Sequence, residues 1–449
     1  MPPRPPRMPP ASRAPPRSAG RHARRPSPPT DRPVDDRRQR RSATTSVSAA
    51  TGSLTVSGRF RTRGQPAAVG AVMAMLASGM PHALLLAGPP GIGKDTLADD
   101  IAAALLCRAP DPASRPCREC RGCRAFEHGN HPDVHRLGPT GPGLVIPIGG
   151  REERGVRDLV RDLALMPVEG GARVAMVTAA DRMTEDAQSA FLKTLEEPPA
   201  GTVLILTAAD EERLLPTIRS RCVRIRLGPV ARREVEGMLV DAELADAPLA
   251  ARLARLSGGR PGEAVALARA PEGLVIRSEV GRTLLDLTAA SRADRLRIGR
   301  DLLARAGELN ASIRTATQAQ AAQALGAGRT TRGRRKEPSP AERGAEPADG
   351  ESPAAGPAAR IPASERRAAA LALVAIWRDV TRDLALVTLG EPGDVRQLEL
   401  LDDLEVAARR LPAGFAAAQL HRLDVAGERL EGNVSPELVV DVLALGWAA

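Results

Sequence analysis

The sequence lacks an acidic pair where a nucleotide-hydrolysing fold needs one. A glycine-rich loop runs from Gly88 to Thr96, and the next expected core strand ends at Val177, followed by Thr178 and Ala179. In phosphate-loop hydrolases an acid at the end of that strand holds Mg²⁺, and its neighbour acts on the attacking water. Neither Thr178 nor Ala179 has the carboxylate that this position needs to hold Mg²⁺ or to act as a base. We therefore expect a phosphate-binding architecture that does not hydrolyse nucleotide.

Aromatic residues and long apolar runs are also scarce. Aromatic side chains make up 1% of the chain and tyrosine is absent, which argues against a base-stacking platform for single strands. No apolar run reaches the roughly 18 residues that a membrane-spanning helix needs. The N-terminus has no apolar stretch of the signal-peptide type. We expect a soluble, cytoplasmic protein that does not contact a membrane.

The net charge of +10 is concentrated at the N-terminus. Residues 1–45 contain twelve Arg, no Lys and three Asp, so nine of the ten net charges lie there and the remainder is near neutral. The same segment contains twelve Pro. Such a composition cannot bury a core, and we predict a disordered tail over 1–56. A mis-assigned start codon and a tether for phosphate backbones are the alternatives.

Short apolar runs alternate with helical patterns between residues 57 and 227. Helical spacing covers Thr96–Cys107 and Thr184–Leu195. The expected buried strands are Ala83–Ala87, Val174–Val177, Val203–Leu206 and Val223–Leu227. Buried strands separated by helices predict a parallel sheet that is covered on both faces.

The pattern is purely helical after residue 227. We predict a small helical domain over 228–272 and a second helical domain over 273–449, interrupted by a Gly/Pro/Ala-rich linker at 326–362. A basic cluster inside this linker, Arg329 to Lys336, is read as solvated, with nucleic-acid contact as the alternative. After the linker we expect helices from Ser364, near Val395–Leu411, and at Pro436–Leu445 with Asn433 or Ser435 as the cap.

The glycine-rich loop nearly fits a phosphate-binding loop. Its candidate phosphate contacts are Gly88, Gly91, Gly93, Lys94 and Thr96. Glycines let backbone N–H groups close around phosphates, and the lysine meets the terminal oxygens. The residue after Lys94 should be Ser or Thr to bind Mg²⁺, but it is Asp95, and Thr96 lies about 100° further round the helix. The pattern predicts the fold and leaves ATP binding open.

Four cysteines follow at metal-site spacing. Cys107, Cys117, Cys120 and Cys123 read C-x9-C-x2-C-x2-C, which is typical of a tetrahedral structural zinc site. Disulfides are disfavoured in the cytosol. Four thiolates leave no open position, so we expect a structural Zn²⁺ and not a catalytic one. Unpaired thiols are the alternative. His128, His131 and His135 follow and are read as surface or turn residues.

Arg221 lies between Ser220 and Cys222, just before the last expected strand. Taken alone, it is an ordinary surface arginine, and Cys222 is a small buried residue. An arginine at a domain edge can also reach a phosphate held by a neighbouring subunit and stabilise transition-state charge, an effect of about 10³–10⁵ in rate. Both interpretations stay open from the residues alone.

Several motifs together resemble the bacterial clamp-loader branch of the AAA+ proteins. The resemblance covers about 60–449 apart from the linker. It is carried by Pro81–Leu85, the four-cysteine insert, Gly129–Asp133, Asp181 with Thr184–Ala187, Phe191–Pro199, Ser220–Cys222, Ser257–Gly262 and Trp377–Val380. The run Lys193–Pro199 joined to Ser220-Arg221-Cys222 is highly specific for this branch. The last motif resembles the collar domain of a subunit that does not hydrolyse ATP.

The resemblance implies a fold and a set of site roles. The fold is an α/β P-loop AAA+ core with a parallel sheet over 57–227, a helical lid over 228–272 and an all-α C-terminal collar domain over 273–449. Arg221 falls at the arginine finger that serves a neighbouring subunit in trans. Thr207 falls at the first nucleotide sensor and Arg260 at the second. Polar residues at the ends of elements are the alternative for both sensors.

The resemblance also implies partners. We expect a rigid, non-hydrolysing subunit of a hetero-pentamer with the motor subunits (gamma/tau) and the delta subunit of DNA polymerase III. The sliding clamp and primed DNA would be contacted through the complex. The first alternative is an ATP-hydrolysing motor subunit of the gamma/tau type, against which Thr178 and Ala179 speak. The second is a zinc-stabilised adaptor outside replication.

Overall fold

The computed structural model describes residues 59–447, apart from 142–143, 151–152, 170, 328–361, 413 and 433. Side chains of 319–327 are not described either. The predicted tail (1–56) and the basic cluster from Arg329 lie outside the described residues. Most of the predicted linker (326–362) also lies outside them. Residues 326–327, at its start, belong to helix α11, which ends at Ala327. None of the described helices is long and apolar enough to cross a membrane.

Five parallel strands form the sheet. Their spatial order is β2-β3-β4-β1-β5. Their bounds are β1 (Ala83–Ala87), β2 (Val134–Leu137), β3 (Arg173–Val177), β4 (Thr202–Ala208) and β5 (Val223–Arg226). β1 pairs with β4 and β5, so the strand before the phosphate loop lies inside the sheet. Every residue of β1, β3 and β4 is buried, which is why these strands read as continuous apolar runs.

Strand β2 was not predicted. Four strands were expected from the sequence, and the fifth lies at the edge of the sheet beside β3. It carries the polar residues His135 and Arg136 and is only partly buried. An edge strand needs no continuous apolar run, so four residues of mixed polarity give too weak a signal.

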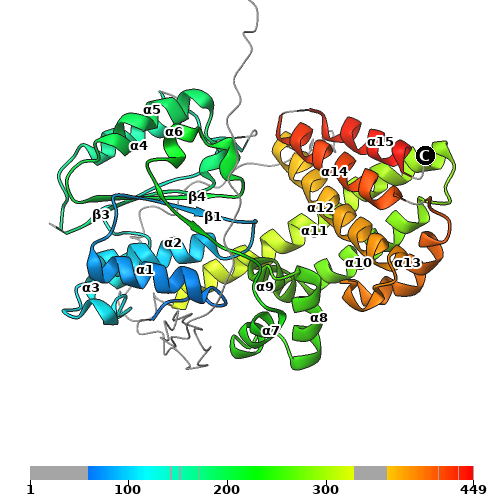
Figure 1. Ribbon diagram of the computed structural model, residues 1–449, viewed down its shortest axis with the longest axis horizontal. Coiled ribbons are helices and arrows are strands. Elements are labelled where there is room, and N and C mark those ends of the chain that lie inside the picture. Colours follow the sequence, from blue (N-terminus) through cyan, green and yellow to red (C-terminus); the bar gives the residue numbers. More distant parts are fainter. Residues whose placement is uncertain are drawn as a thin grey trace, which may run out of the picture. The chain divides into compact units, whose positions relative to one another are not determined.

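Helices cover both faces of the sheet (Figure 1). Those of the core are α1 (Pro66–Ser78), α2 (Lys94–Leu106), α3 (Arg121–Glu127), α4 (Val156–Leu163), α5 (Glu185–Glu196) and α6 (Pro216–Arg219). Leu84 and Leu86 of β1 pack with buried residues of α1 and α2. Leu85 packs with α4 and α5 on the other face. This alternation gives two apolar layers, as a doubly covered sheet requires.

In the part of the chain that the structure describes after β5, the regular elements are all helices. Their bounds are α7 (Arg232–Asp241), α8 (Ala247–Ser257), α9 (Pro261–Arg269), α10 (Pro271–Asp286), α11 (Arg292–Ala327), α12 (Ala363–Thr388), α13 (Leu401–Ala408), α14 (Phe415–Glu431) and α15 (Pro436–Gly446). Trp377 and Trp447 are both fully buried, with ring centroids 5.3 Å apart in an edge-on arrangement. Ser435 caps α15, its hydroxyl accepting from Leu438 N–H.

Two expectations for the last helices were wrong. The helix expected near Val395–Leu411 is shorter, because short 3₁₀ turns at Pro392–Asp394 and Leu398–Leu400 precede α13. Helix α14 was not predicted at all. It begins at Phe415, which three alanines follow, and buries only four of its residues, so its apolar stripe is narrow.

Candidate functional site

The phosphate loop joins β1 to α2. Its three glycines, Gly88, Gly91 and Gly93, all have positive φ. Gly88 is required sterically, because a Cβ there would lie 2.4 Å from the carbonyl oxygen of Leu227. The loop is tied to the helices that follow the sheet through a 2.8 Å hydrogen bond from Gly262 N–H to Gly91 O. The structure therefore keeps the loop geometry that the glycine spacing predicts.

Lys94 turns back onto the loop. Its Nζ donates to Gly88 O at 2.6 Å and to Pro89 O at 2.8 Å, and the residue is 8% exposed. Burial lowers the pKa of Lys94, and the charges of Asp95 and Asp181 oppose that shift. Two of the three N–H donors of this ammonium thus bind carbonyls of the loop itself.

Asp95 and Thr207 satisfy one another. Thr207 lies in β4 and is 2% exposed. Its Oγ1 donates to Asp95 Oδ1 at 3.0 Å and accepts from Ala179 N–H at 3.1 Å. The position that would normally offer a metal-binding hydroxyl instead holds a carboxylate paired with the residue predicted as the first sensor.

Positions 178 and 179 have other uses in this fold. Thr178 Oγ1 donates to Leu137 O on the neighbouring strand at 3.3 Å. Ala179 has φ +50 and begins a short 3₁₀ turn. The next acid along the chain, Asp181, accepts from Ala209 N–H at 3.1 Å. The sequence indicated Asp181 only as part of a family motif. In the structure its negative charge raises the pKa of Lys94 and so opposes the effect of burial.

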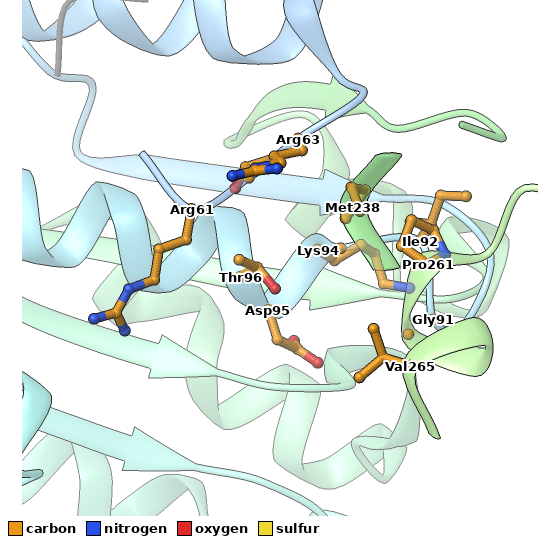
Figure 2. A pocket seen from close by; sticks show the side chains of 13 residues that line it. Arg61, Arg63, Gly91, Ile92, Lys94, Asp95, Thr96, Met238, Pro261 and Val265 are labelled. Atoms are coloured by element: carbon orange, nitrogen blue, oxygen red, sulfur yellow. The ribbon is translucent and has the colours of Figure 1, made fainter. Parts of the chain in front are cut away.

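Phosphate-loop residues line a cavity of about 330 Å³. The lining residues come from the segment before α1, the phosphate loop with the start of α2, α7 and α9 (Figure 2). Thr96 is exposed and faces this space with Asp95. The lining residues are Arg61, Thr62, Arg63, Gly91, Ile92, Gly93, Lys94, Asp95, Thr96, Met238, Pro261, Gly262 and Val265. The predicted contacts from Gly91 to Thr96 thus converge on one cavity, walled by the segment before α1 on one side and by α7 and α9 on another.

Arg260 is held by charges outside the cavity. Its Nη2 pairs with Glu263 at 2.6 Å and lies 3.6 Å from Asp379 of α12. Arg277, 6% exposed, bridges the same two carboxylates. Burial raises the pKa of Glu263 above its usual value, although the charges of Arg277 and Arg260 oppose this shift. Arg260, which was predicted as the second sensor, is thus part of a partly buried ion network with Glu263, Arg277 and Asp379.

Arg221 lies at the edge of the core, two residues after α6. Its Nη1 donates to Thr217 O at 2.9 Å, and its Nη2 pairs with Glu196 at the end of α5. The side chains of Arg221 and Glu196 are 33% and 49% exposed. An ion pair this exposed contributes about 0–1 kcal/mol, so exchanging it for another anion costs little. Cys222 is buried, which raises its pKa to about 12, and has no nucleophilic character.

The four predicted metal ligands converge at the other end of α2. All four Sγ atoms of the cysteines at 107, 117, 120 and 123 lie within 4.8 Å of one another. A tetrahedral zinc with Zn–S bonds of about 2.3 Å places its sulfurs about 3.8 Å apart, so the cluster fits such an ion. Five backbone N–H groups point at the sulfurs at 3.4–3.5 Å, as thiolate ligands require.

The thiols of this cluster differ in proton affinity. Burial raises the pKa of Cys120, but the Arg108 and Cys123 amides and the neighbouring thiols outweigh burial and lower it to about 6. Burial raises the pKa of Cys123. Of the three histidines expected at the surface or in turns, His131 is buried and begins a turn: Val134 N–H donates to His131 O, and Asp133 N–H donates to His131 Nδ1, both at 3.2 Å.

Comparisons with known proteins agree on the core. Residues 64–231 match the family described as DNA polymerase III, delta subunit. The delta-prime subunit of Escherichia coli K12 is 40% identical over 191 residues, which cover 41% of this chain and 54% of the relative. The core resembles delta-prime subunits. The Bacillus subtilis delta-prime subunit is 31% identical and covers 44% of this chain and 57% of the relative.

The match to delta-prime is stronger than the match to motor subunits. The tau subunit of Escherichia coli is 30% identical over 206 residues, and only 31% of its length is covered. The chain spans about half the length of the delta-prime relatives that it matches. The clamp-loader resemblance drawn from the sequence motifs is confirmed by these matches.

Two solved structures show how far the fold likeness extends. A Thermotoga maritima RuvB mutant (P216G) has a TM-score of 0.33 at 19% identity and covers 48% of this chain and 65% of its own. A gamma-subunit-related protein of DNA polymerase III from the same organism has a TM-score of 0.30 at 18% identity, covering 80% and 99%. Scores this low add no weight, and the α/β assignment rests on the parallel sheet itself.

Two residues of the site were missed from the sequence. Asp100 of α2 is 1% exposed and accepts hydrogen bonds from the segment that walls the cavity. Arg118, inside the cysteine loop, pairs with it. The only signal was an acid on the helix face that also carries Leu97 and Ile101, where an apolar residue is expected.

Proposed function

We propose that this chain is a delta-prime subunit of the DNA polymerase III clamp loader that does not hydrolyse ATP. The observation that carries the proposal is the pairing of Asp95 with Thr207 beside a loop whose Lys94 is bound to its own carbonyls. A motor site keeps these groups free for Mg²⁺ and phosphate. The similarity of residues 64–231 to delta-prime relatives supports the same assignment.

Arg221 is the group through which the chain acts on its neighbour. We assign it as an arginine finger that leaves Glu196 and reaches the phosphates of ATP held by an adjacent motor subunit. A planar guanidinium suits this role because it stabilises spread negative charge with two parallel donors. An effect of about 10³–10⁵ in rate corresponds to roughly 4–7 kcal/mol of transition-state stabilisation.

The partners of the proposed complex follow the same assignment. They are gamma/tau motor subunits and the delta subunit in a hetero-pentamer in the cytoplasm, with the sliding clamp and primed DNA contacted through the ring. The four cysteines hold a structural Zn²⁺, which supplies no reaction step. It closes the loop after α2 by binding four thiolates.

Reconstitution with motor and delta subunits tests the finger. Arg221→Ala is expected to leave assembly intact and to lower the ATPase of the ring at least about tenfold, because the donated charge is lost. Arg224→Ala is the matched control, since Arg224 lies three residues away, is 48% exposed and faces Glu211 at 3.9 Å. An unchanged ATPase in the Arg221→Ala ring contradicts the finger role.

The purified chain separates this proposal from a motor subunit. We expect no ATP turnover above background. ATP turnover that the Lys94→Ala substitution abolishes would mean that the phosphate loop binds and hydrolyses ATP, as in a motor subunit. Failure to assemble with motor and delta subunits would favour the zinc-stabilised adaptor instead.

A further inference from the structure

One wall of the cavity is a short segment before α1. Arg61, Thr62 and Arg63 line the cavity. Figure 2 shows Arg61 and Arg63 on this segment, apart from Pro261 of α9. This segment is neither helix nor strand. Its position therefore depends on side chains that hold it from outside.

Asp100 provides the central anchor. Its carboxylate accepts from the backbone N–H of Arg61 at 3.0 and 3.1 Å, from Thr62 N–H at 2.8 Å and from Thr62 Oγ1 at 2.7 Å. The Asp100 side chain is 1% exposed. A buried carboxylate needs a positive partner as well as hydrogen bonds, because an uncompensated charge is costly away from water.

Arg118 supplies that partner from the cysteine loop. Its Nη2 pairs with Asp100, its Nη1 lies 3.5 Å from Glu127, and its Nε donates to Arg59 O at 3.1 Å. The side chain is 9% exposed. A second link runs through the backbone, where Arg59 N–H donates to Pro116 O at 3.4 Å.

The conformation of Arg118 depends on the cysteines around it. Its φ is +62, a region that costs a non-glycine residue about 1–2 kcal/mol and needs support from its surroundings. Cys117 precedes it directly, and Cys120 follows two residues later. When both sulfurs bind one ion, the backbone between them is fixed and the Arg118 side chain is aimed at Asp100.

We propose that Arg118 is a positioning residue that couples the four-cysteine site to the cavity. With metal bound, Arg118 and Asp100 hold Arg61 and Thr62 as the cavity wall. When the metal leaves, the loop relaxes and the wall is released. This inference rests on the metal binding proposed above and is independent of the clamp-loader role.

Hydrogen exchange of the full chain tests the coupling. Peptides covering 59–66 are compared in zinc-loaded protein, in protein stripped by a chelator and in stripped protein reloaded with zinc alone. Stripping should speed exchange of the Arg61 and Thr62 amides at least about tenfold, and reloading should restore it. Zinc content measured on the same samples identifies a chain that never held the ion.

Arg118→Ala isolates the residue from the metal. It should keep one zinc and still show fast exchange at 61–62, and stripping should add nothing further. Arg121→Ala is the matched control, because Arg121 lies three residues away at the start of α3, is 78% exposed and contacts Glu169 at 3.4 Å. It should behave as wild type.

The outcomes divide clearly. Protected amides at 61–62 in stripped wild type, or in a chain that never binds zinc, overturn the coupling. If Arg118→Ala also loses zinc, the stripped and reloaded wild type still decides the question. ATPase of the reconstituted ring is not a readout here, so failure of this inference and failure of the finger role are told apart.

Discussion

The two ends of helix α2 differ in what their polar side chains contact. Thirteen residues, about 20 Å of helix, separate the phosphate loop from the first metal-ligand candidate. At the N-terminal end, Lys94 and Asp95 have found partners within the chain. At the C-terminal end, the Sγ atoms of four cysteines lie within 4.8 Å of one another and fit a tetrahedral zinc ion. The polar groups of the phosphate loop take partners from the chain itself, whereas the four sulfurs have their donors converging on one point.

The largest expected effect is at the cysteine end. Cys123→Ala should abolish zinc binding and lower the melting temperature by about 10 °C or more, because structural zinc contributes folding free energy of about 10–16 kcal/mol in small domains. Zinc content and calorimetry measure it. Cys222→Ala, which removes the fifth cysteine outside the cluster, should keep the metal. If the Cys123→Ala protein kept zinc and its melting temperature, the four-cysteine cluster would not be a structural zinc site.

An intermediate effect is expected from reopening the phosphate end. Asp95→Thr combined with Thr178→Asp and Ala179→Glu removes a carboxylate from beside the phosphates and restores metal ligands. Mg²⁺-dependent ATP binding should strengthen at least about tenfold, or 1.4 kcal/mol, by calorimetric titration. The control combines Asp99→Thr with the same two substitutions at 178 and 179, so its net charge matches; Asp99 also lies on α2 and pairs with Arg136 at 2.8 Å. Equal ATP affinity in both variants would mean that the Asp95–Thr207 pair does not close the site.

The smallest effect concerns the charge of Lys94. Burial lowers its pKa from 10.5, so between the lowered pKa and 10.5 the unfolded chain binds more protons than the folded one. The free energy of unfolding should therefore rise with pH across that window. Urea unfolding of wild type and Lys94→Met should diverge there, whereas exposed Lys193→Met should follow wild type. If the free energies of unfolding of wild type and Lys94→Met changed with pH in parallel, burial would not lower the pKa of the Lys94 ammonium.

Sequence patterns predicted the sheet core, because buried strands such as Ala83–Ala87 and Val174–Val177 are unbroken apolar runs between helices. They missed β2 and α14, whose apolar signals are weak. The cysteine cluster was predicted because ligand spacing is local. The pairing of Arg118 with Asp100 was not, because the partners lie in different elements and neither residue belongs to a motif.

The sequence alone determined which chemistry is possible at each end of α2. The absence of acids at 178 and 179, the aspartate at 95 and the four cysteines are facts of composition and spacing. Only the tertiary structure decided what the remaining polar groups do: Lys94 bonds its own loop, Thr207 bonds Asp95, and Arg118 reaches the cavity wall through Asp100. The physical reason is that a buried polar group takes whichever partner the fold brings within reach, and the fold brings these together from distant parts of the chain.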